Sequence, residues 1–168
     1  RLDLPENESA YIISTSTNHK DIYLRSASWI HAGKMQAYDH QQSTFEILDL
    51  EPEGKYDNPE GLTSERVMVR SHDGVQIPLS IIYQKNVQLT GENPTILSGY
   101  GSYGSARSVY YRASRMAWLE QGGIIAIAHV RGGGEYGKEW HLMGQKANKP
   151  NTWKDFISCA EYLIDKGY

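Results

Sequence analysis

Short β-rich runs alternate with polar turns along the first third of the chain. Four such runs lie at residues 10–16, 21–28, 34–39 and 45–50. Strands repeated every 8–12 residues are typical of an antiparallel meander, and one four-stranded sheet is also the unit of a β-propeller blade. Because a fragment of a β-sandwich has the same pattern, the periodicity alone leaves both architectures open.

A polar segment without hydrophobic periodicity, residues 51–65, follows these runs and contains two prolines and two glycines. Such a composition is typical of an exposed connection between packed regions. We therefore predict a strand-rich segment over residues 1–55 and an α/β segment over residues 56–168.

The hydrophobic pattern changes after this connection. Alternating positions on both sides of Asp73-Gly74 predict a hairpin, since this dipeptide favours a turn with positive φ. A strand is predicted at residues 94–100, and the unbroken apolar run 124–130 is typical of a strand buried on both faces. Between these two strands, residues 107–123 predict a helix that Gly122 and Gly123 end.

The last predicted element is a helix over residues 151–167. Asn151 or Thr152 would cap it, with Asp155 completing a capping box with Thr152, and Gly167 stands where a glycine commonly ends a helix. One apolar stripe is expected to face the core: Trp153, Phe156, Ile157, Ala160 and Ile164. This order of hairpin, strand, helix, buried strand and helix predicts the opening of an α/β domain with a mostly parallel sheet.

The composition is that of a soluble globular protein, with 39% hydrophobic and 22% charged residues and a net charge of −3. Without a block of Lys or Arg, neither nucleic acid nor a membrane is expected as a partner. The single cysteine, Cys159, excludes an internal disulfide and lies in no pattern typical of a nucleophile. His141 and Glu139 lack the spacing of a zinc site, so no metal is expected.

Two glycine-rich stretches, GYGSYG at residues 99–104 and GGGEYG at 132–137, both match the dinucleotide fingerprint G-x-G-x-x-G. A dinucleotide site requires the glycines to open a helix directly, so that its N–H groups meet the pyrophosphate. Neither stretch is predicted to open a helix directly, because SARSVYY follows Gly104 and the segment after Gly137 is broken by Gly144 and Pro150. We therefore expect neither a nucleotide nor any other cofactor. The glycines instead predict sharp turns at the carboxyl edge of two adjacent parallel strands, where open α/β sheets bind their ligands.

The side chains of these two turns are the candidate site: Tyr100, Tyr103, Arg131, Glu135 and Tyr136. Arg131 and Glu135 are candidates either for binding a substrate charge or for a structural ion pair that braces the glycine loop. We favour the ion pair, because a fixed loop needs satisfied polar groups. His129 ends a buried strand and is expected to be a hydrogen-bonded core residue.

The stretches GYGSYG, AHVRGGGEYGKEWH and NTWKDF, in this order, resemble the prolyl oligopeptidase family of serine peptidases over residues 66–168. The earlier segment DIYLRSASWIHAGKMQAYD is similar to the last propeller blade of that family. The resemblance implies a β-propeller followed by an α/β-hydrolase domain that cleaves short peptides. It also implies that the Tyr100 hydroxyl helps to form the oxyanion hole and that Tyr103 lines the specificity pocket, with Arg131 as a further substrate-binding candidate.

The ending S-Y-G of the first stretch is more similar to oligopeptidase B, which cuts after Arg or Lys, than to the prolyl-specific branch. The nucleophile motif G-x-S-x-G is absent from the sequence. In the family this motif follows the strand after the last predicted helix. We therefore expect an excised piece that ends before the catalytic Ser, Asp and His and is inactive alone.

The full-length protein is expected to be a serine oligopeptidase that acts through an acyl-enzyme. Its expected partners are short peptides and, for this chain, the remainder of its own polypeptide. Two alternatives stay open: an esterase on the same scaffold, and a non-catalytic homologue that binds without hydrolysis. The sequence leaves both a cytoplasmic and a periplasmic location open.

Overall fold

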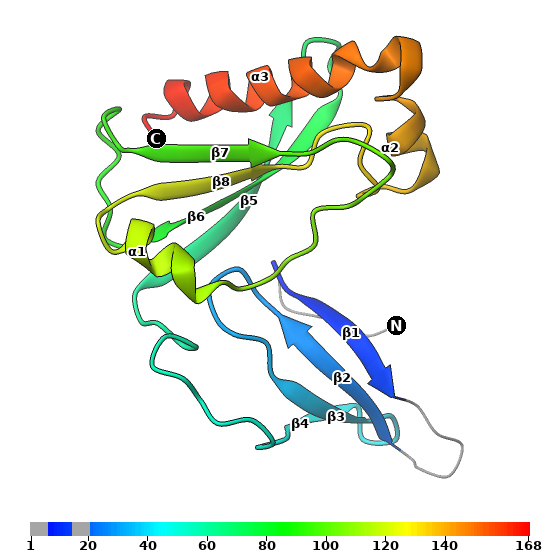
Figure 1. Ribbon diagram of the computed structural model, residues 1–168, viewed down its shortest axis with the longest axis vertical. Coiled ribbons are helices and arrows are strands. Elements are labelled where there is room, and N and C mark those ends of the chain that lie inside the picture. Colours follow the sequence, from blue (N-terminus) through cyan, green and yellow to red (C-terminus); the bar gives the residue numbers. More distant parts are fainter. Residues whose placement is uncertain (1–6, 15–20) are drawn as a thin grey trace. The chain divides into compact units, whose positions relative to one another are not determined.

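The structure is a computed structural model that describes residues 7–14 and 21–168 (Figure 1). The chain divides into two compact units. The first contains the described residues up to Glu60 together with Val109–Ser114, and the second contains Gly61–Ser108 and Arg115–Tyr168. The predicted connection is irregular and mostly exposed as far as Gly61, whereas residues 62–65 belong to the first strand of the second unit.

The first unit is one antiparallel sheet of four strands in the order β1-β2-β3-β4. The strands are β1 (Ser9–Ser14), β2 (Asp21–Ala27), β3 (Met35–Asp39) and β4 (Thr44–Ile47). The predicted meander is confirmed, although residues 15 and 16 of its first run lie outside the described residues. A single sheet is not a closed propeller, so the likeness to a propeller blade stays a prediction.

Residues 109–114 belong to the first unit although their neighbours in sequence belong to the second. The Tyr110 ring packs against Trp29, which is almost fully buried, with 5.9 Å between the ring centroids. The Tyr111 hydroxyl donates a hydrogen bond to the carbonyl of Tyr56. Two successive tyrosines are thus both held by tertiary contacts within this unit.

The helix predicted over residues 107–123 is therefore wrong for its first half. Only a 3₁₀ turn (Ala113–Arg115) and the single turn α1 (Met116–Leu119) are helical. Tertiary packing of Tyr110 and Tyr111 outweighs the local helical pattern, as packing often does. The predicted end is confirmed, because Gly122 follows the helix with a φ of +79°.

The second unit contains a mixed sheet of four strands in the order β5-β6-β8-β7. The strands are β5 (Leu62–Arg70), β6 (Gln76–Gln84), β7 (Thr95–Gly99) and β8 (Ile124–Ala128). The β5–β6 hairpin turns at Asp73-Gly74 as predicted, and Gly74 has a φ of +88°. Only β7 and β8 run parallel, so the expectation of a mostly parallel sheet is wrong for these four strands.

Strand β8 is buried along its whole length, as its unbroken apolar sequence predicts. Helix α3 (Pro150–Asp165) packs against this sheet, and Figure 1 shows α3 and α1 on opposite sides of it. None of the helices in the described part of the chain is long and apolar enough to cross a membrane.

The face that α3 turns to the sheet differs from the predicted one. The buried positions are Thr152, Asp155, Cys159 and Leu163. Of the predicted stripe, Trp153, Ile157 and Ile164 are exposed, the last by 74%, whereas Ala160 is half-buried and Phe156 packs against the core as expected. The helix is thus rotated by about one residue from the apolar stripe, because Asp155 has a buried partner, described below.

The predicted capping box of α3 is also wrong. Lys149 holds the N-cap position without a side-chain capping bond, and Pro150 opens the helix. The side chains of Thr152 and Asp155 make tertiary hydrogen bonds instead. The predicted end is confirmed: Gly167 follows the last turn with a φ of +78°.

Candidate functional site

Two loops leave the same edge of the second unit's sheet. The first loop (residues 100–108) follows β7 and the second loop (residues 129–137) follows β8. Because β7 and β8 are adjacent and parallel, both loops begin at the carboxyl ends of their strands, as predicted. The candidate site is therefore built by residues far apart in the sequence.

The glycines allow the backbones of these loops to touch. A Cβ on Gly132 would lie 2.2 Å from the carbonyl oxygen of Gly101, and one on Gly134 would lie 2.1 Å from that of Gly104. The N–H of Gly104 donates to the carbonyl of Gly132 at 3.1 Å. Close approach of two backbones therefore explains both fingerprint-like sequences without a nucleotide. A helix does begin after Gly137, contrary to expectation, but α2 (Lys138–Leu142) has only five residues.

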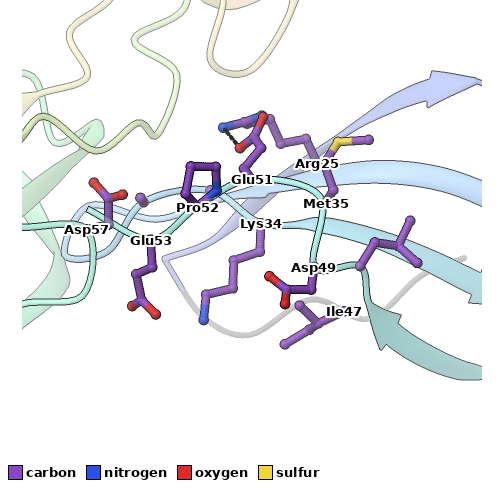
Figure 2. Close-up of a pocket in the computed structure, with 12 residues that line it drawn as sticks. Arg25, Lys34, Met35, Ile47, Asp49, Glu51, Pro52, Glu53 and Asp57 are labelled. Atoms are coloured by element: carbon purple, nitrogen blue, oxygen red, sulfur yellow. Dashed lines mark hydrogen bonds and ion pairs between the residues drawn. The ribbon is translucent and has the colours of Figure 1, made fainter. Parts of the chain in front are cut away.

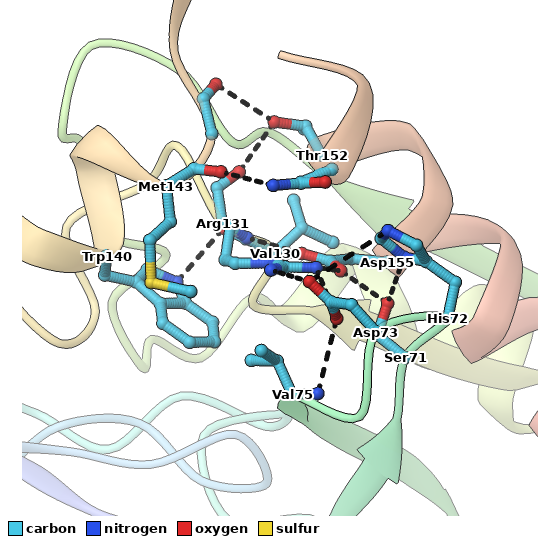
Figure 3. A network of polar contacts seen from close by, with 12 residues as sticks. Ser71, His72, Asp73, Val75, Val130, Arg131, Trp140, Met143, Thr152 and Asp155 are labelled. Atoms are coloured by element: carbon cyan, nitrogen blue, oxygen red, sulfur yellow. Dashed lines mark hydrogen bonds and ion pairs between the residues drawn. The ribbon is translucent and has the colours of Figure 1, made fainter. Parts of the chain in front are cut away.

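A buried ion pair joins the second loop to α3 (Figure 3). The Arg131 guanidinium donates from Nη2 to Asp155 Oδ1 at 2.6 Å and from Nε to Asp155 Oδ2 at 2.9 Å. Both side chains are fully buried. Asp155 also accepts hydrogen bonds from the Ser71 hydroxyl, 2.6 Å from Oδ1, and from the backbone N–H of Arg131, 3.1 Å from Oδ2. The geometry is bidentate, which is the strong form of an Arg–carboxylate contact.

Arg131 has a second carboxylate partner in the β5–β6 turn, where its Nη1 donates to Asp73 Oδ2 at 2.6 Å. Burial by itself would lower the pKa of Arg131, but the hydrogen bonds to Asp155 and Asp73 raise it above its ordinary value. The bond from Arg131 likewise holds the pKa of Asp73 below its usual range. Arg131 is charged throughout the physiological range.

The expected ion pair of Arg131 therefore exists, but with Asp155 and Asp73 instead of Glu135. This placement argues against direct contact of Arg131 with a substrate, since its guanidinium is enclosed and bonded to two carboxylates. The sequence pattern indicates Asp155 only as part of a helix cap and Asp73 only as a turn residue, and it predicts neither as a partner of Arg131.

Glu135 braces the two loops through different partners. Its Oε1 accepts a hydrogen bond from the backbone N–H of Arg107 at 2.9 Å and lies 3.6 Å from His129 Nδ1. Burial would raise the pKa of Glu135, but His129 and the Arg107 N–H lower it below the ordinary value. The other ring nitrogen of His129 lies 2.9 Å from the Ser80 hydroxyl, which confirms the predicted core histidine.

Three of the candidate residues reach solvent: Tyr100, Tyr103 and Tyr136. Tyr100 directly follows β7, is 48% exposed, and its hydroxyl has no hydrogen-bond partner among residues 7–14 and 21–168. Tyr103 is 89% exposed and has a φ of +55°, a left-handed conformation that is uncommon outside glycine. Tyr136 lies further along the second loop and packs edge-on against Trp140, with centroids 4.9 Å apart.

Cys159 is fully buried in α3, and burial raises the pKa of its thiol to about 12. It is therefore protonated and inert as a nucleophile, as expected.

A pocket of about 310 Å³ lies in the first unit (Figure 2). It is lined by charged and apolar side chains, including Lys34, Met35 and Ile47, and by the ion pair of Arg25 with Glu51, which is 2.7 Å long. Its charges are partly paired with one another, and none of its lining residues belongs to the two loops. We therefore place the candidate site at the loops.

Comparisons with known proteins identify what the chain is similar to. The sequence model of the prolyl oligopeptidase family matches residues 109–168. A prolyl endopeptidase of Elizabethkingia meningoseptica is 36% identical over 167 residues, which cover 99% of this chain and 23% of that protein. The chain belongs to the prolyl oligopeptidase family.

Solved structures of this family share the fold of the chain. A prolyl endopeptidase structure superposes with a TM-score of 0.86 at 31% identity, covering 99% of this chain and 24% of that one. Oligopeptidase B of Trypanosoma brucei superposes with a TM-score of 0.85, also at 31% identity and with the same coverage. The chain thus spans about a quarter of the length of the relatives it matches.

The contact between the two loops predicts unequal effects of two glycine substitutions. Gly132→Ala should lower the free energy of unfolding by about 2 kcal/mol more than Gly137→Ala. Both positions have positive φ, +97° and +80°, but only Gly132 has a neighbouring backbone where the Cβ would lie. Chemical denaturation of both variants measures the difference. Equal losses would show that the loops do not touch.

The buried ion pair predicts that Arg131→Met lowers the free energy of unfolding by about 3–5 kcal/mol, because it leaves the Asp155 carboxylate buried without its countercharge. The control is Arg70→Met on β5, since Arg70 is exposed and its loss should change stability by less than about 0.5 kcal/mol. Denaturation curves of the two variants that coincide would contradict the buried pair.

Proposed function

We propose that the chain is part of a serine oligopeptidase that hydrolyses short peptides through an acyl-enzyme. The observation that carries the proposal is the position of Tyr100: a phenol that reaches solvent, has no partner in the described residues, and begins a loop fixed at the carboxyl edge of the sheet. Curated relatives named as peptidases support the same class of reaction, among them "Dipeptidyl aminopeptidase BI" of Pseudoxanthomonas mexicana.

Tyr100 has the chemistry required of an oxyanion-hole donor. Attack on a peptide carbonyl places negative charge on its oxygen, and a donor aimed at that oxygen stabilises the transition state. A phenol is neutral near pH 7, so it donates a hydrogen bond without carrying a charge. One such donor lowers the activation barrier by about 3–4 kcal/mol, provided that it is held in place before the reaction.

For Tyr103 we propose contact with a substrate side chain. Its exposure and left-handed backbone support this role, because strained residues are retained where the strain serves a function. For Arg131 we propose a positioning role, in which the guanidinium holds the second loop against α3 and the β5–β6 turn.

We propose the class of reaction, and two residue preferences for cleavage each have support. The S-Y-G sequence of the first loop supports cleavage after Arg or Lys, and the prolyl endopeptidase at 36% identity supports cleavage after Pro. We also propose a division into a strand-rich domain over residues 1–55 and an α/β-hydrolase domain over residues 56–168. An esterase and a non-catalytic binding protein on this scaffold are the alternatives.

The role of Tyr100 predicts a specific kinetic defect in the complete polypeptide. Tyr100→Phe should lower kcat by about 10²-fold while KM changes little, because the donor acts mainly in the transition state. Steady-state assays with fluorogenic peptides that contain Arg, Lys or Pro measure both constants. An unchanged kcat would assign Tyr100 to packing, and turnover of esters but not of peptides would favour the esterase.

The 168-residue chain by itself is predicted to have no peptidase activity. Oxyanion stabilisation and binding leave a residual rate only where the site is assembled, and the sequence contains no G-x-S-x-G nucleophile. Incubation of the purified chain with the same peptides and with a fluorophosphonate probe is the test. Turnover, or stoichiometric labelling of a serine, would place the active site elsewhere in these residues.

A further inference from the structure

Lys149 directs its ammonium group into the first loop from the position just before α3. Its Nζ donates to the carbonyl oxygen of Gly101 at 2.6 Å and lies 3.0 Å from the Ser102 hydroxyl and 3.3 Å from the Thr152 hydroxyl. An ammonium group has three donors, so these three acceptors engage all of them. The side chain is only partly exposed, which strengthens the bonds relative to those of a surface lysine.

The residues that Lys149 holds lie between the two tyrosines of the candidate site. Gly101 directly follows Tyr100, and Ser102 directly precedes Tyr103. Gly101 and Tyr103 both have left-handed backbones, with φ of +63° and +55°. Glycine adopts this conformation readily, but a tyrosine keeps it only where its surroundings hold it, and a charge-assisted hydrogen bond to the Gly101 carbonyl supplies such an anchor.

Helix stability does not explain a lysine at this place. A cation at the start of a helix opposes the helix dipole, so Lys149 weakens α3 if it acts on the helix alone. The centre of the Trp153 ring lies 5.9 Å from Nζ and gives the ammonium a further favourable contact. This contact does not explain why Nζ also bonds to the first loop. The contacts that account for Lys149 are those to the first loop.

Thr152 extends this anchor to the second loop. Its hydroxyl donates to the carbonyl of Arg131 at 2.7 Å, and its methyl group occupies the space where a Cβ of Gly101 would lie, at 2.4 Å. The start of α3 therefore contacts both loops. Of Lys149 and Thr152, only Lys149 makes its contact through a charged group.

We propose that Lys149 is a positioning residue for Tyr100. By bonding the carbonyl of Gly101, the residue after Tyr100, the ammonium group fixes the direction of the phenol hydroxyl at the carboxyl edge of the sheet. This inference rests on the proposed function of Tyr100 as an oxyanion donor. A small displacement of a catalytic group lowers the rate of the chemical step more than it weakens substrate binding.

The test is a double-mutant cycle in the complete polypeptide, with Lys149→Met, Tyr100→Phe and the two combined. Lys149→Met should lower kcat about 10-fold while KM stays within about twofold. In the Tyr100→Phe background the same substitution should lower kcat by less than about twofold, because the group that it positions is already absent. The matched control is Lys154→Met, which removes the same charge from an exposed position on α3 and should leave kcat unchanged.

The outcomes separate this inference from the proposed function. If Tyr100→Phe lowers kcat and the fold-losses in kcat of the two single variants multiply in the double variant, Lys149 acts independently of Tyr100 and the inference is wrong. If Lys149→Met behaves as Lys154→Met, the inference is also wrong. If Tyr100→Phe leaves kcat unchanged, the proposed function itself fails. If Lys149→Met does not fold, Ser102→Ala replaces it in the same double-mutant cycle. Ser102→Ala removes one acceptor of the ammonium, so the expected loss of kcat is smaller.

Discussion

The buried ion pair of Arg131 with Asp155 determines how the second unit is assembled. Burying two charges costs several kcal/mol for each ion, and good geometry must offset this cost. Helix α3 can therefore dock in one rotation only, the one that turns Asp155 toward the guanidinium. Trp153 and Ile157 are exposed in that rotation although both are apolar. The same rotation buries Cys159 and Leu163 and packs Phe156 against the core, so the ion pair and part of the apolar surface share one face.

The same rotation brings the start of α3 onto the first loop. Residues three apart lie on one face of a helix, so the position that faces inward one turn before Asp155 is Thr152, and Lys149 precedes it by the same interval. The three side chains bond, in chain order, to Gly101, to the carbonyl of Arg131 and to the guanidinium of Arg131. One helix face therefore positions both loops, and the ion pair fixes that face.

Sequence patterns predicted the elements that depend on local chemistry. The burial of β8, the turn at Gly74 and the end of α3 at Gly167 follow from hydrophobic runs and from positive φ. The buried face of α3 could not be predicted, because hydrophobic periodicity assigns the inward face to the apolar stripe and cannot recognise a buried carboxylate whose partner lies 24 residues away. The first half of the helix predicted over residues 107–123 is wrong because Tyr110 and Tyr111 make contacts with Trp29 and Tyr56, which are distant in sequence.

The candidate site was predictable in its place but not in its support. Glycines after two adjacent strands indicated the carboxyl edge, and a family resemblance selected Tyr100 from several exposed tyrosines. No sequence pattern assigns a role to Lys149, since a single lysine before a helix has no spacing or period that indicates what it binds. Its role becomes apparent only when the distance from Nζ to the Gly101 carbonyl is known.

The glycines and the charged side chains of the two loops are physically linked. Glycines let the backbones approach, but each one also has more conformational freedom in the unfolded chain and so opposes the ordering of the loop. Contact between glycines supplies little side-chain packing to offset that entropy. Polar side chains supply the missing contacts. Lys149 and His141, from outside the loops, bond the carbonyls of Gly101 and Gly132, and Glu135 of the second loop accepts from the N–H of Arg107. A rigid site built on glycine therefore requires polar neighbours, which explains why groups outside the proposed chemistry surround the loop that begins at Tyr100.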